Sequence, residues 1–447
     1  MNKFAATNCR SVTLAGNSTR SNLRVPRFCR ALFAAGMLIT LSTFALAQAG
    51  RLDSTFGQGG KVITNVPGPT NAIANAVALQ PDGRIIVAGG LGAGQAIGLV
   101  RYNANGVLDG SFGKSGIALA AIPNNILSSA TGVAIHSDGR ILAGGTVYTL
   151  ANATAFIGLG VVRFNTNGSM DSSFGTAGVV KVLPFHATRC GGGPVALQPD
   201  GKVLLAGSCN IGTGPNSTGF STIVRFNTNG SLDSAFGIGG AAVLAEDPST
   251  IALQTDGKIL AAGGGTLARY NTNGSVDPSF GIFGSVGSIG TAAAVAVQSD
   301  GKIVVAGTFS DQLSVAPDGD FALVRYNSDG TVDQGFGTRG GALADFFTGT
   351  SSAAAFAIAI QANSDIVVAG KAIQGSNPSQ FALARFTSLG SLDSSFGTGG
   401  VVTTSFGQTD SVASIVLQTD GKIVAAGNSR NATNSNDAFA LARYIAP

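Results

Sequence analysis

The sequence has few of the side chains that most often carry out chemistry. Its 447 residues include two His, a single Glu (Glu246), four Cys and no Trp, and only 11% are charged, where about 25% is usual. No HExxH, GxSxG or Walker motif is present. Acid–base and metal catalysis depend mainly on His, carboxylates and Cys, so these shortages favour a binding or structural role over an enzyme.

The low charge does not indicate disorder. Disordered chains are polar and highly charged, whereas this chain has a mean hydropathy of +0.31. Its 65 Gly do not recur at every third position, which excludes collagen. The length exceeds what one ordinary core serves, so we expect several domains or a repeat array.

The first 47 residues have the features of a secretory signal peptide. They hold six basic residues and no acidic one, and an uncharged run, Ala31 to Ala49, ends near the motif Ala45-Leu46-Ala47. We therefore predict a signal peptide over 1–47 that is cleaved near Ala47, and an exported protein that is periplasmic, at the cell surface or secreted. The alternative is a membrane anchor, because 19 uncharged residues nearly span a bilayer; with cleavage, no stable membrane span remains.

Removal of this segment changes the charge balance. Without its six basic residues the chain keeps 21 Lys and Arg against 23 Asp and Glu. A nucleic-acid partner would need a basic face, so we exclude that class of function.

Three motifs recur seven times, in the same order, over the rest of the chain. The first, of which LDSTFG is an example, begins at residues 52, 108, 170, 232, 276, 332 and 392. The second, such as PDGRIIVAG, begins at 81, 137, 199, 255, 299, 363 (in degenerate form) and 419. The third, such as LVRYN, begins at 99, 161, 223, 267, 323, 383 and 441.

Each repeat predicts four short β-strands, a to d. Asp-Gly between two apolar runs predicts a hairpin with a type I′ turn, and a second turn follows the LVRYN segment. We predict an all-β, seven-bladed β-propeller with four-stranded antiparallel blades; a β-solenoid is the alternative. Because the repeat begins with strand d, the N-terminal strand, around 60–66, should complete the last blade beside 441–445 and close the ring.

The pattern LDxxFGxxG, VALQxDGKIxVAG, LxRYNxxG resembles the bacterial delta-60 repeat family, and its strand order resembles the NHL-type blade. The likeness covers 51–447, which we predict to be a single domain of seven repeats. It implies no activity, ligand or cofactor, and we expect no cofactor. Without Trp, the chain also lacks the tryptophan-docking signature of quinoprotein propellers and the Trp-bearing boxes of sialidases.

Arg and Asp recur in every repeat with a constant separation of eight residues. If the intervening turn has three residues with Gly in the left-handed region, the two side chains lie opposite each other on adjacent strands and share a face. We predict seven structural pairs: Arg101 with Asp109, Arg163 with Asp171, Arg225 with Asp233, Arg269 with Asp277, Arg325 with Asp333, Arg385 with Asp393, and Arg443 with Asp53. The seven Phe from Phe56 to Phe396 should fill the space between blades.

Cys190 and Cys209 are predicted to form a disulfide, as an exported protein allows. The Asp200-Gly201 turn should place Cys209 opposite Gly192, two residues from Cys190. A metal site of His186 and Cys190 is the alternative. His136 replaces the Gln of other repeats, which indicates a structural role.

Any ligand should bind on the face that carries loops of variable length. The loops between strands b and c range from three residues (264–266) to fifteen (146–160, 208–222, 308–322). Asp311, Asp318 and Asp320 form a weak calcium candidate there, and Tyr148 is a candidate stacking platform. We expect a protein, peptide or glycan ligand over the central axis. The alternatives are a propeller lyase or hydrolase acting on an extracellular polymer, and a sensor or docking domain separated from a larger partner.

Overall fold

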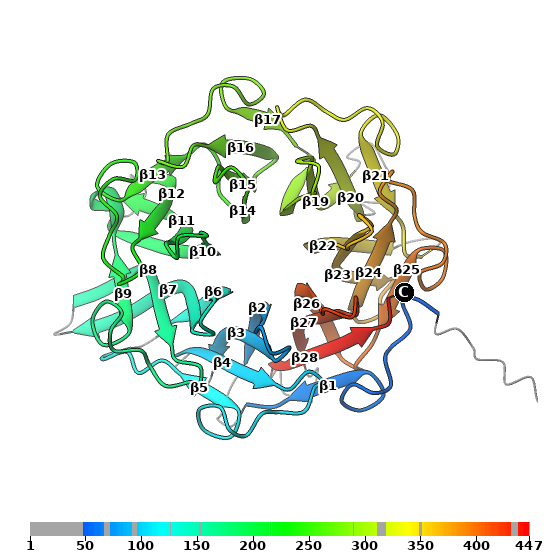
Figure 1. Ribbon diagram of the computed structural model, residues 1–447, viewed down its shortest axis with the longest axis horizontal. Coiled ribbons are helices and arrows are strands. Elements are labelled where there is room, and N and C mark those ends of the chain that lie inside the picture. Colours follow the sequence, from blue (N-terminus) through cyan, green and yellow to red (C-terminus); the bar gives the residue numbers. More distant parts are fainter. Residues whose placement is uncertain are drawn as a thin grey trace, which may run out of the picture. The chain divides into compact units, whose positions relative to one another are not determined.

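The strands of the protein are arranged in a ring (Figure 1). The computed structural model describes residues 48–66, 72–91, 96–125, 127–151, 154–213, 215, 217–288, 290–310, 319–347, 351–430 and 437–446. All of them belong to one compact unit, Leu46–Pro447. The predicted signal peptide, Asp311 and Asp318 lie outside the described residues.

Seven four-stranded sheets make up the ring. Blade 1 contains β2 (Ile73–Leu79), β3 (Ile85–Leu91), β4 (Ala96–Tyr102) and β5 (Ile117–Leu119). Blade 2 contains β6 (Ser129–Ile135), β7 (Ile141–Ala151), β8 (Thr154–Phe164) and β9 (Val179–Val182). Blade 3 contains β10 (Arg189–Leu197), β11 (Val203–Ile211), β12 (Thr218–Phe226) and β13 (Ala241–Leu244), and a short 3₁₀ turn, η2 (Pro184–His186), precedes it. Blade 4 contains β14 (Thr250–Leu253), β15 (Ile259–Gly263), β16 (Thr266–Tyr270) and β17 (Ser285–Gly287).

The other three blades repeat this arrangement. Blade 5 contains β18 (Thr291–Val297), β19 (Ile303–Ser310), β20 (Gly319–Tyr326) and β21 (Gly341–Ala344). Blade 6 contains β22 (Ser351–Ile360), β23 (Ile366–Gln374), β24 (Gln380–Phe386) and β25 (Val401–Thr404). Blade 7 contains β26 (Thr409–Leu417), β27 (Ile423–Arg430), β28 (Asp437–Tyr444) and β1 (Lys61–Thr64). Every pairing is antiparallel, so the predicted seven-bladed propeller is confirmed.

The N-terminal strand completes the last blade, as predicted. β1 pairs with β28, with Lys61 opposite Ala442 and Thr64 opposite Phe439. The β1 ladder covers 439–442. Gly60 and the residues before it extend the contact over 443–445, since Arg443 N–H donates to Gly60 C=O (3.0 Å) and Ile445 N–H donates to Arg51 C=O (2.8 Å).

The two chain ends together rebuild the turn between strands c and d that the other blades form covalently. Gly50 N–H donates to Ile445 C=O (2.7 Å), and Ile445 N–H donates to Arg51 C=O (2.8 Å). The φ of Gly50, +84°, matches the +83° of Gly106 in the covalent turn of blade 1. Ala49 is buried beside it. The ring is thus closed by hydrogen bonds, and the contacts reach back to Gln48.

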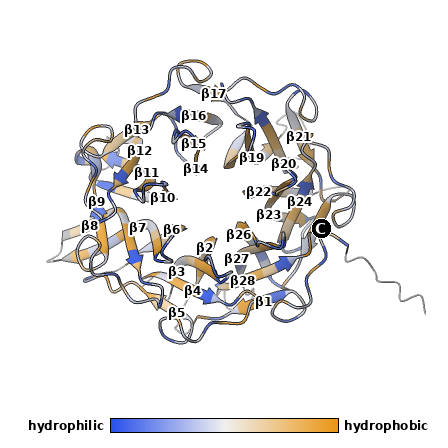
Figure 2. Cartoon of the chain, viewed as in Figure 1, coloured by the Kyte–Doolittle hydropathy of each residue, from blue (hydrophilic) through white to orange (hydrophobic). Residues whose placement is uncertain are grey.

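Hydrophobic contacts between neighbouring blades form the core. Seven clusters of buried residues are present among the described residues, and each joins two consecutive blades. Strand β3 is buried along its whole length, because both of its faces pack against other blades. Figure 2 shows the apolar residues concentrated on the strands and the more polar ones in the turns between them.

The Asp-Gly turns form hairpins, but not with the predicted type I′ geometry. In blade 1, Gly83 has φ +83° whereas Asp82 is not among the residues with positive φ. Gln80 and Arg84 face each other across a three-residue loop, and the Arg84 N–H donates to Asp82 Oδ1 (3.0 Å). Asp is therefore favoured here because its side chain accepts a backbone hydrogen bond two residues on, and only the Gly needs the left-handed conformation.

A second glycine requirement explains the end of the VAG motif. In six blades the register between strands a and b shifts beside the last Gly of this motif. The shift brings a carbonyl group of strand a over strand b. A Cβ on Gly89 would lie 1.8 Å from the Ile73 carbonyl oxygen. The motif therefore conserves room for a bulge of the innermost strand.

Candidate ligand-binding site

The structure brings together all seven Arg–Asp pairs predicted from the sequence. In six blades Arg Nε lies close to Asp Oδ2, at 2.9 Å (Arg101–Asp109), 2.7 Å (Arg163–Asp171), 2.7 Å (Arg225–Asp233), 2.8 Å (Arg269–Asp277), 2.8 Å (Arg325–Asp333) and 2.7 Å (Arg385–Asp393). In blade 7 the Arg443 Nη2 to Asp53 Oδ2 distance is 2.9 Å, and this pair joins the two chain ends. The predicted cross-strand geometry holds because Asp109 N–H donates to Arg101 C=O.

Six of the seven Arg also donate a hydrogen bond to the next blade among the described contacts. Arg101 donates through Nη1 to the Thr166 carbonyl in the turn of blade 2, and its guanidinium lies 4.4 Å from the centre of the Phe112 ring. Phe112 is fully buried and packs against Gly168 of the same neighbouring turn, where a Cβ would lie 3.0 Å from the ring. The recurring Arg, Asp, Phe and Gly therefore form the joint between blades.

A second cation reaches the Asp in six of the seven blades. It is the Lys or Arg after the Asp-Gly turn, as in Lys422, whose Nζ lies 3.2 Å from Asp53 Oδ2. Burial alone raises the pKa of Asp53, but hydrogen bonds from Thr55 and Lys422 and the charge of Arg443 outweigh it and lower the pKa to about 2. In blade 6 the residue after the turn is Asp365 instead of a Lys or Arg. Among the described ion pairs, Asp393 therefore has Arg385 as its one cationic partner.

The residues that recur on the Asp-Gly face are thus engaged in structural contacts. Their charges are neutralised within each blade, and the carboxylates are held ionised by their partners. A binding function has to be sought where the blades differ.

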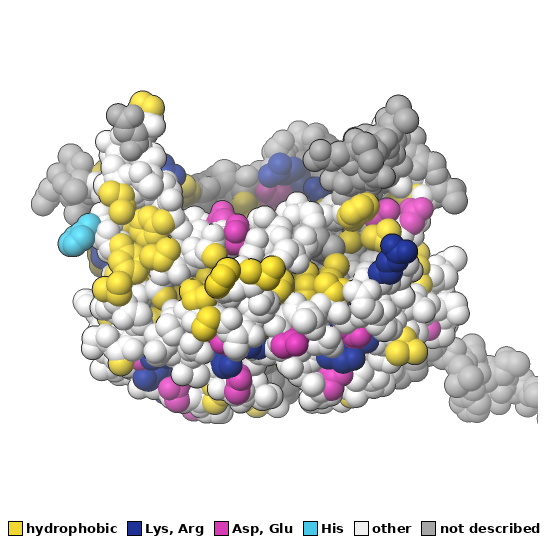
Figure 3. Space-filling model, turned by 90° about the horizontal axis from the view of Figure 1, so that it is seen from above, with side chains coloured by type: hydrophobic (Ala, Val, Ile, Leu, Met, Phe, Trp, Pro, Cys, Tyr) yellow, Lys and Arg dark blue, Asp and Glu magenta, His cyan; other side chains and the backbone are white. Residues whose placement is uncertain are grey.

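The opposite face has hairpins of very different height. β7 and β8 have eleven residues each; β7 ends at Ala151 and β8 begins at Thr154. Most of the segment 146–160, which we expected to be a loop, is therefore strand. The β15–β16 hairpin instead turns at Gly264 and Gly265. Figure 3 shows the outer wall with this face upward. The rim of the propeller is high at the left of this view and low in the middle, on the side of blade 4.

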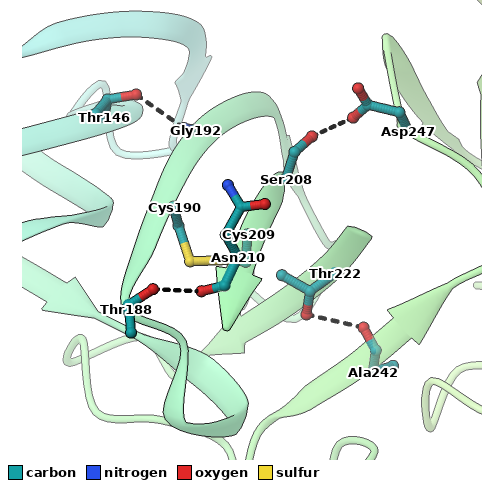
Figure 4. Close-up of a disulfide and its surroundings, with 10 residues drawn as sticks. All are labelled: Thr146, Thr188, Cys190, Gly192, Ser208, Cys209, Asn210, Thr222, Ala242 and Asp247. Atoms are coloured by element: carbon teal, nitrogen blue, oxygen red, sulfur yellow. Dashed lines mark hydrogen bonds between the residues drawn. A yellow bond between two sulfur atoms is a disulfide. The ribbon is translucent and has the colours of Figure 1, made fainter. Parts of the chain in front are cut away.

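The Cys190–Cys209 disulfide stiffens the rim next to this gap (Figure 4). The two Cα atoms lie 4.0 Å apart, and Cys190 is directly opposite Cys209 in the β10–β11 register. The prediction that Cys209 faces Gly192 was wrong by two residues, because the hairpin loop is longer than assumed and a bulge between Gly192 and Val195 shifts the register. The disulfide leaves Cys190 without a thiolate, which overturns the alternative His186–Cys190 metal site.

A cavity of about 480 Å³ opens on the rim of blade 3, beside the connection to blade 4. Its lining comes from β11, β12 and the segment after β13, and includes Asn210, Phe220, Glu246 and Asp247. The Phe220 ring is held edge-on against Phe185, with centroids 5.9 Å apart. Ser208 Oγ donates to Asp247 Oδ1, as Figure 4 shows. A pocket with one aromatic ring and several hydrogen-bonding groups is suited to a small polar ligand.

The two carboxylates give this cavity a negative charge. Neither Glu246 nor Asp247 has a Lys or Arg partner among the ion pairs of the described residues. Asn210 and Ser208 add an amide and a hydroxyl. The arrangement can accept hydrogen bonds from ammonium, guanidinium or sugar hydroxyl groups.

Other residues singled out from the sequence do not join this cavity. Asp320 lies in β20 opposite Phe309, Tyr148 lies in β7 opposite Ile157, and His136 takes the repeat's Gln position beside Gly201 of the next blade. The described part of the chain contains no group of three His, Cys, Asp or Glu side chains that could hold a metal ion. It also contains no helix long and apolar enough to cross a membrane.

Sequence reasoning missed the carboxylates of the cavity. Glu246 was noted as the single Glu of the chain, and Asp247 is one of the few Asp outside the repeated motifs. That departure from the repeat is the signal that could have identified them. Their proximity to Ser208 depends on the path of the connection from β13 to β14, which the repeat does not specify.

Three other cavities lie away from the rim. One of about 690 Å³ lies on the outer wall at blades 1 to 3, and the wall at blades 7 and 1 has another, of about 450 Å³, that is lined by equivalent repeat positions. A third, of about 540 Å³, lies among the joint residues of the Asp-Gly face. We assign these cavities to the packing of the repeat. The linings of the two wall cavities use equivalent repeat positions, and the residues that line the third take part in the joints between blades. The lining of the rim cavity is found in one place.

Comparison with known families gives one match. Seven segments of the chain, 80–112, 136–174, 198–236, 254–280, 298–336, 361–396 and 418–444, match the family described as "Domain of unknown function (DUF5122) beta-propeller". No curated protein matches the chain.

Solved structures of similar arrangement share little sequence with the chain. A polysaccharide lyase, Uly1, has 13% identity and a TM-score of 0.47, and the match covers 87% of this chain and 92% of that one. The α-L-arabinofuranosidase Arb93A from Fusarium graminearum has 9% identity and a TM-score of 0.42, covering 88% and 98%. The PQQ-bound aldose sugar dehydrogenase from Streptomyces coelicolor has 11% identity and a TM-score of 0.38, covering 70% and 93%. Likenesses at this level carry no argument about function.

Proposed function

Because the chain belongs to the DUF5122 β-propeller family, which is named for its fold and not for an activity, we propose from its own residues that it is an exported, non-enzymatic binding scaffold. The observation that carries the proposal is the acidic rim cavity of blade 3, where the lining departs from the repeat. The propeller holds this site on rigid strands, and the disulfide fixes the strand that carries Asn210.

The chemistry of the cavity defines the class of ligand. Glu246, Asp247 and Asn210 accept hydrogen bonds, and the Phe220 ring offers an apolar surface. We propose that the ligand is a peptide or glycan that presents a basic or hydroxyl-rich group on one side and an apolar face on the other. A cation near Phe220 would gain a further attraction from the ring.

Export is part of the same proposal. A disulfide persists in the oxidising compartments that exported proteins reach, and Cys190 and Cys209 form one in this protein. Export is tested by the N-terminal sequence of the protein recovered from the periplasm or medium, which should begin at Gln48.

Binding is tested on peptide and glycan arrays with the purified protein. The variant Glu246→Gln/Asp247→Asn should lose about 10- to 100-fold in affinity for a ligand that the wild type binds, since the loss of one charge-assisted hydrogen bond costs about 1.5–3 kcal/mol. The control Asp256→Asn removes a carboxylate of the Asp-Gly face, outside the cavity, and should bind like the wild type.

Two results would overturn the proposal. Ligands that bind the double variant with full affinity would place the site elsewhere on the propeller. Turnover of a polysaccharide in a parallel hydrolase and lyase panel, abolished in the double variant, would make the protein an enzyme. His136 and His186 both lie outside the lining of this cavity, which favours binding over catalysis.

A further inference from the structure

The outer wall carries large apolar side chains at positions where most blades have polar or small ones. Each blade has a tight turn, FGxxG, just before strand d. Its two variable positions are Gln58-Gly59, Lys114-Ser115, Thr176-Ala177, Ile238-Gly239, Ile282-Phe283, Thr338-Arg339 and Thr398-Gly399. Only the adjacent blades 3 and 4 have Ile, and only blade 4 has Phe.

These side chains do not support the fold. Ile238, Ile282 and Phe283 are 79%, 76% and 87% exposed. Phe283 also has a φ of +54°, in the left-handed region that favours Gly, and three other blades have Gly there. Five blades form the same turn with polar residues, so neither folding nor packing within the chain requires this Phe.

The exposed side chains of the two blades belong to one surface. Gly237, next to Ile238, donates its N–H to the Asn273 carbonyl in the following blade (2.8 Å). Val276, three residues after Asn273 and 47% exposed, packs against Gly284, next to Phe283. Figure 3 shows hydrophobic side chains in a band along this wall. We call the surface made by Ile238, Val276, Ile282 and Phe283 the wall patch.

We propose that the wall patch is the interface of a two-fold symmetric dimer of this chain. Its four side chains carry no charge, so its partner surface should be apolar and uncharged as well, and a second copy of the patch meets that requirement. Proteins that bind anionic lipid use clusters of Lys or Arg beside their apolar residues. The wall patch contains no Lys or Arg, so a second copy of the chain is favoured over anionic lipid.

The repeat gives the turns of blades 3 and 4 the same local geometry. The turns of blades 3 and 4 have matching hydrogen bonds, from Ile238 N–H to Ala241 C=O (2.7 Å) and from Ile282 N–H to Ser285 C=O (2.8 Å). The turn of blade 4 carries Phe283, and the turn of blade 3 has Gly239 at the same position. The space above Gly239 is open, with no atom within 4 Å of an added Cβ. A two-fold axis between the blades places the Phe283 ring of each copy over Gly239 of the other, which is the reciprocal contact of an isologous dimer.

The test measures the oligomeric state of the protein purified after expression of the full chain. Sedimentation equilibrium over a dilution series should show a monomer–dimer equilibrium for the wild type. The variant Phe283→Arg takes the residue that blade 5 has at the same turn position, Arg339, where φ is +55°, so it should fold. Because each dimer loses two buried rings, the dissociation constant should rise at least about 100-fold.

The control removes an exposed apolar side chain from another blade. Leu389 is 67% exposed and stands where four other repeats have Asn, and Leu389→Asn should leave the dissociation constant unchanged. A wild type that stays monomeric at every concentration would refute the proposal. A dimer equally stable in Phe283→Arg would refute it as well. If the wild type is monomeric and floats with neutral phosphatidylcholine vesicles, and Phe283→Arg does not float, the wall patch binds a lipid surface and not a second copy of the chain.

The dimer goes beyond the proposed binding function and does not depend on it. The wall patch and the rim cavity share no residue, so either proposal can fail while the other stands.

Discussion

Blade 6 provides a natural comparison for the strength of the joint between blades. In blade 2, Asp171 contacts two cations, Arg163 Nε at 2.7 Å and Arg140 Nη1 at 3.0 Å. In blade 6, Asp393 contacts Arg385 as its one cation among the described ion pairs. Both carboxylates have little exposure, with side-chain values of 10% and 17%. Removing the joint Arg should therefore have unequal consequences in the two blades.

We expect Arg385→Met to lower the free energy of unfolding by more than Arg163→Met. Removing one partner of a buried ion pair costs about 3–5 kcal/mol, because it leaves an uncompensated charge. Asp171 keeps Arg140, which places Arg163→Met near the lower limit, about 3 kcal/mol. Asp393 keeps only the hydrogen bonds of Ser395, which places Arg385→Met near the upper limit, about 5 kcal/mol.

Urea denaturation followed by far-UV circular dichroism measures this difference, since the chain has no Trp to report by fluorescence. The double variant Arg385→Met/Asp393→Asn should recover part of the loss, because it removes the uncompensated charge. Equal losses in the two blades, or a larger loss for Arg163→Met, would show that the second cation does not compensate the buried carboxylate.

Four further outcomes follow from the same structure. Asp365→Lys, which restores the second cation of blade 6, should raise the urea midpoint, with a gain of about 0.5–1 kcal/mol; a lowered midpoint would contradict the assignment. Cys190→Ala/Cys209→Ala should cost about 3 kcal/mol in the same assay, and an unchanged midpoint would show that the disulfide does not constrain the unfolded chain. Deleting 48–64 should open the ring and cause aggregation, measured by light scattering; a soluble monomer with unchanged melting temperature would rule out closure by β1. The pKa of Asp53 is lowered to about 2 in the folded state, so its contribution to stability is present above about pH 4 and is lost as the pH falls toward 2. Asp53→Asn should flatten this decline in denaturation curves recorded at several pH values, and an unaltered slope would count against it.

The rim and the wall could be predicted from the sequence to different extents. The wall positions of Ile282 and Phe283 stand out once the seven FGxxG turns are aligned, since a repeat position that is polar elsewhere needs no apolar residue for folding. The rim cavity could not be predicted in this way. Glu246 lies in a connection of variable length, and its neighbours Asn210 and Phe220 come from strands more than twenty residues earlier.

By itself, the sequence determined the fold, the closure and the partners of the joint residues. Seven copies of one pattern impose one blade geometry seven times, and a constant spacing of eight residues between Arg101 and Asp109 and their counterparts fixes a cross-strand contact. Such features depend on local turns and on the alternation of strand side chains, which a short segment already specifies.

Only the tertiary structure decided the register of the disulfide, the height of each hairpin and the composition of the rim cavity. The three-residue loop around Asp200 and the bulge between Gly192 and Val195 together bring Cys190 opposite Cys209. The connection from β13 to β14 places Asp247 beside Ser208 of β11, which the length of the segment alone does not specify. The lining of the rim cavity depends on contacts between segments whose relative positions no local pattern encodes.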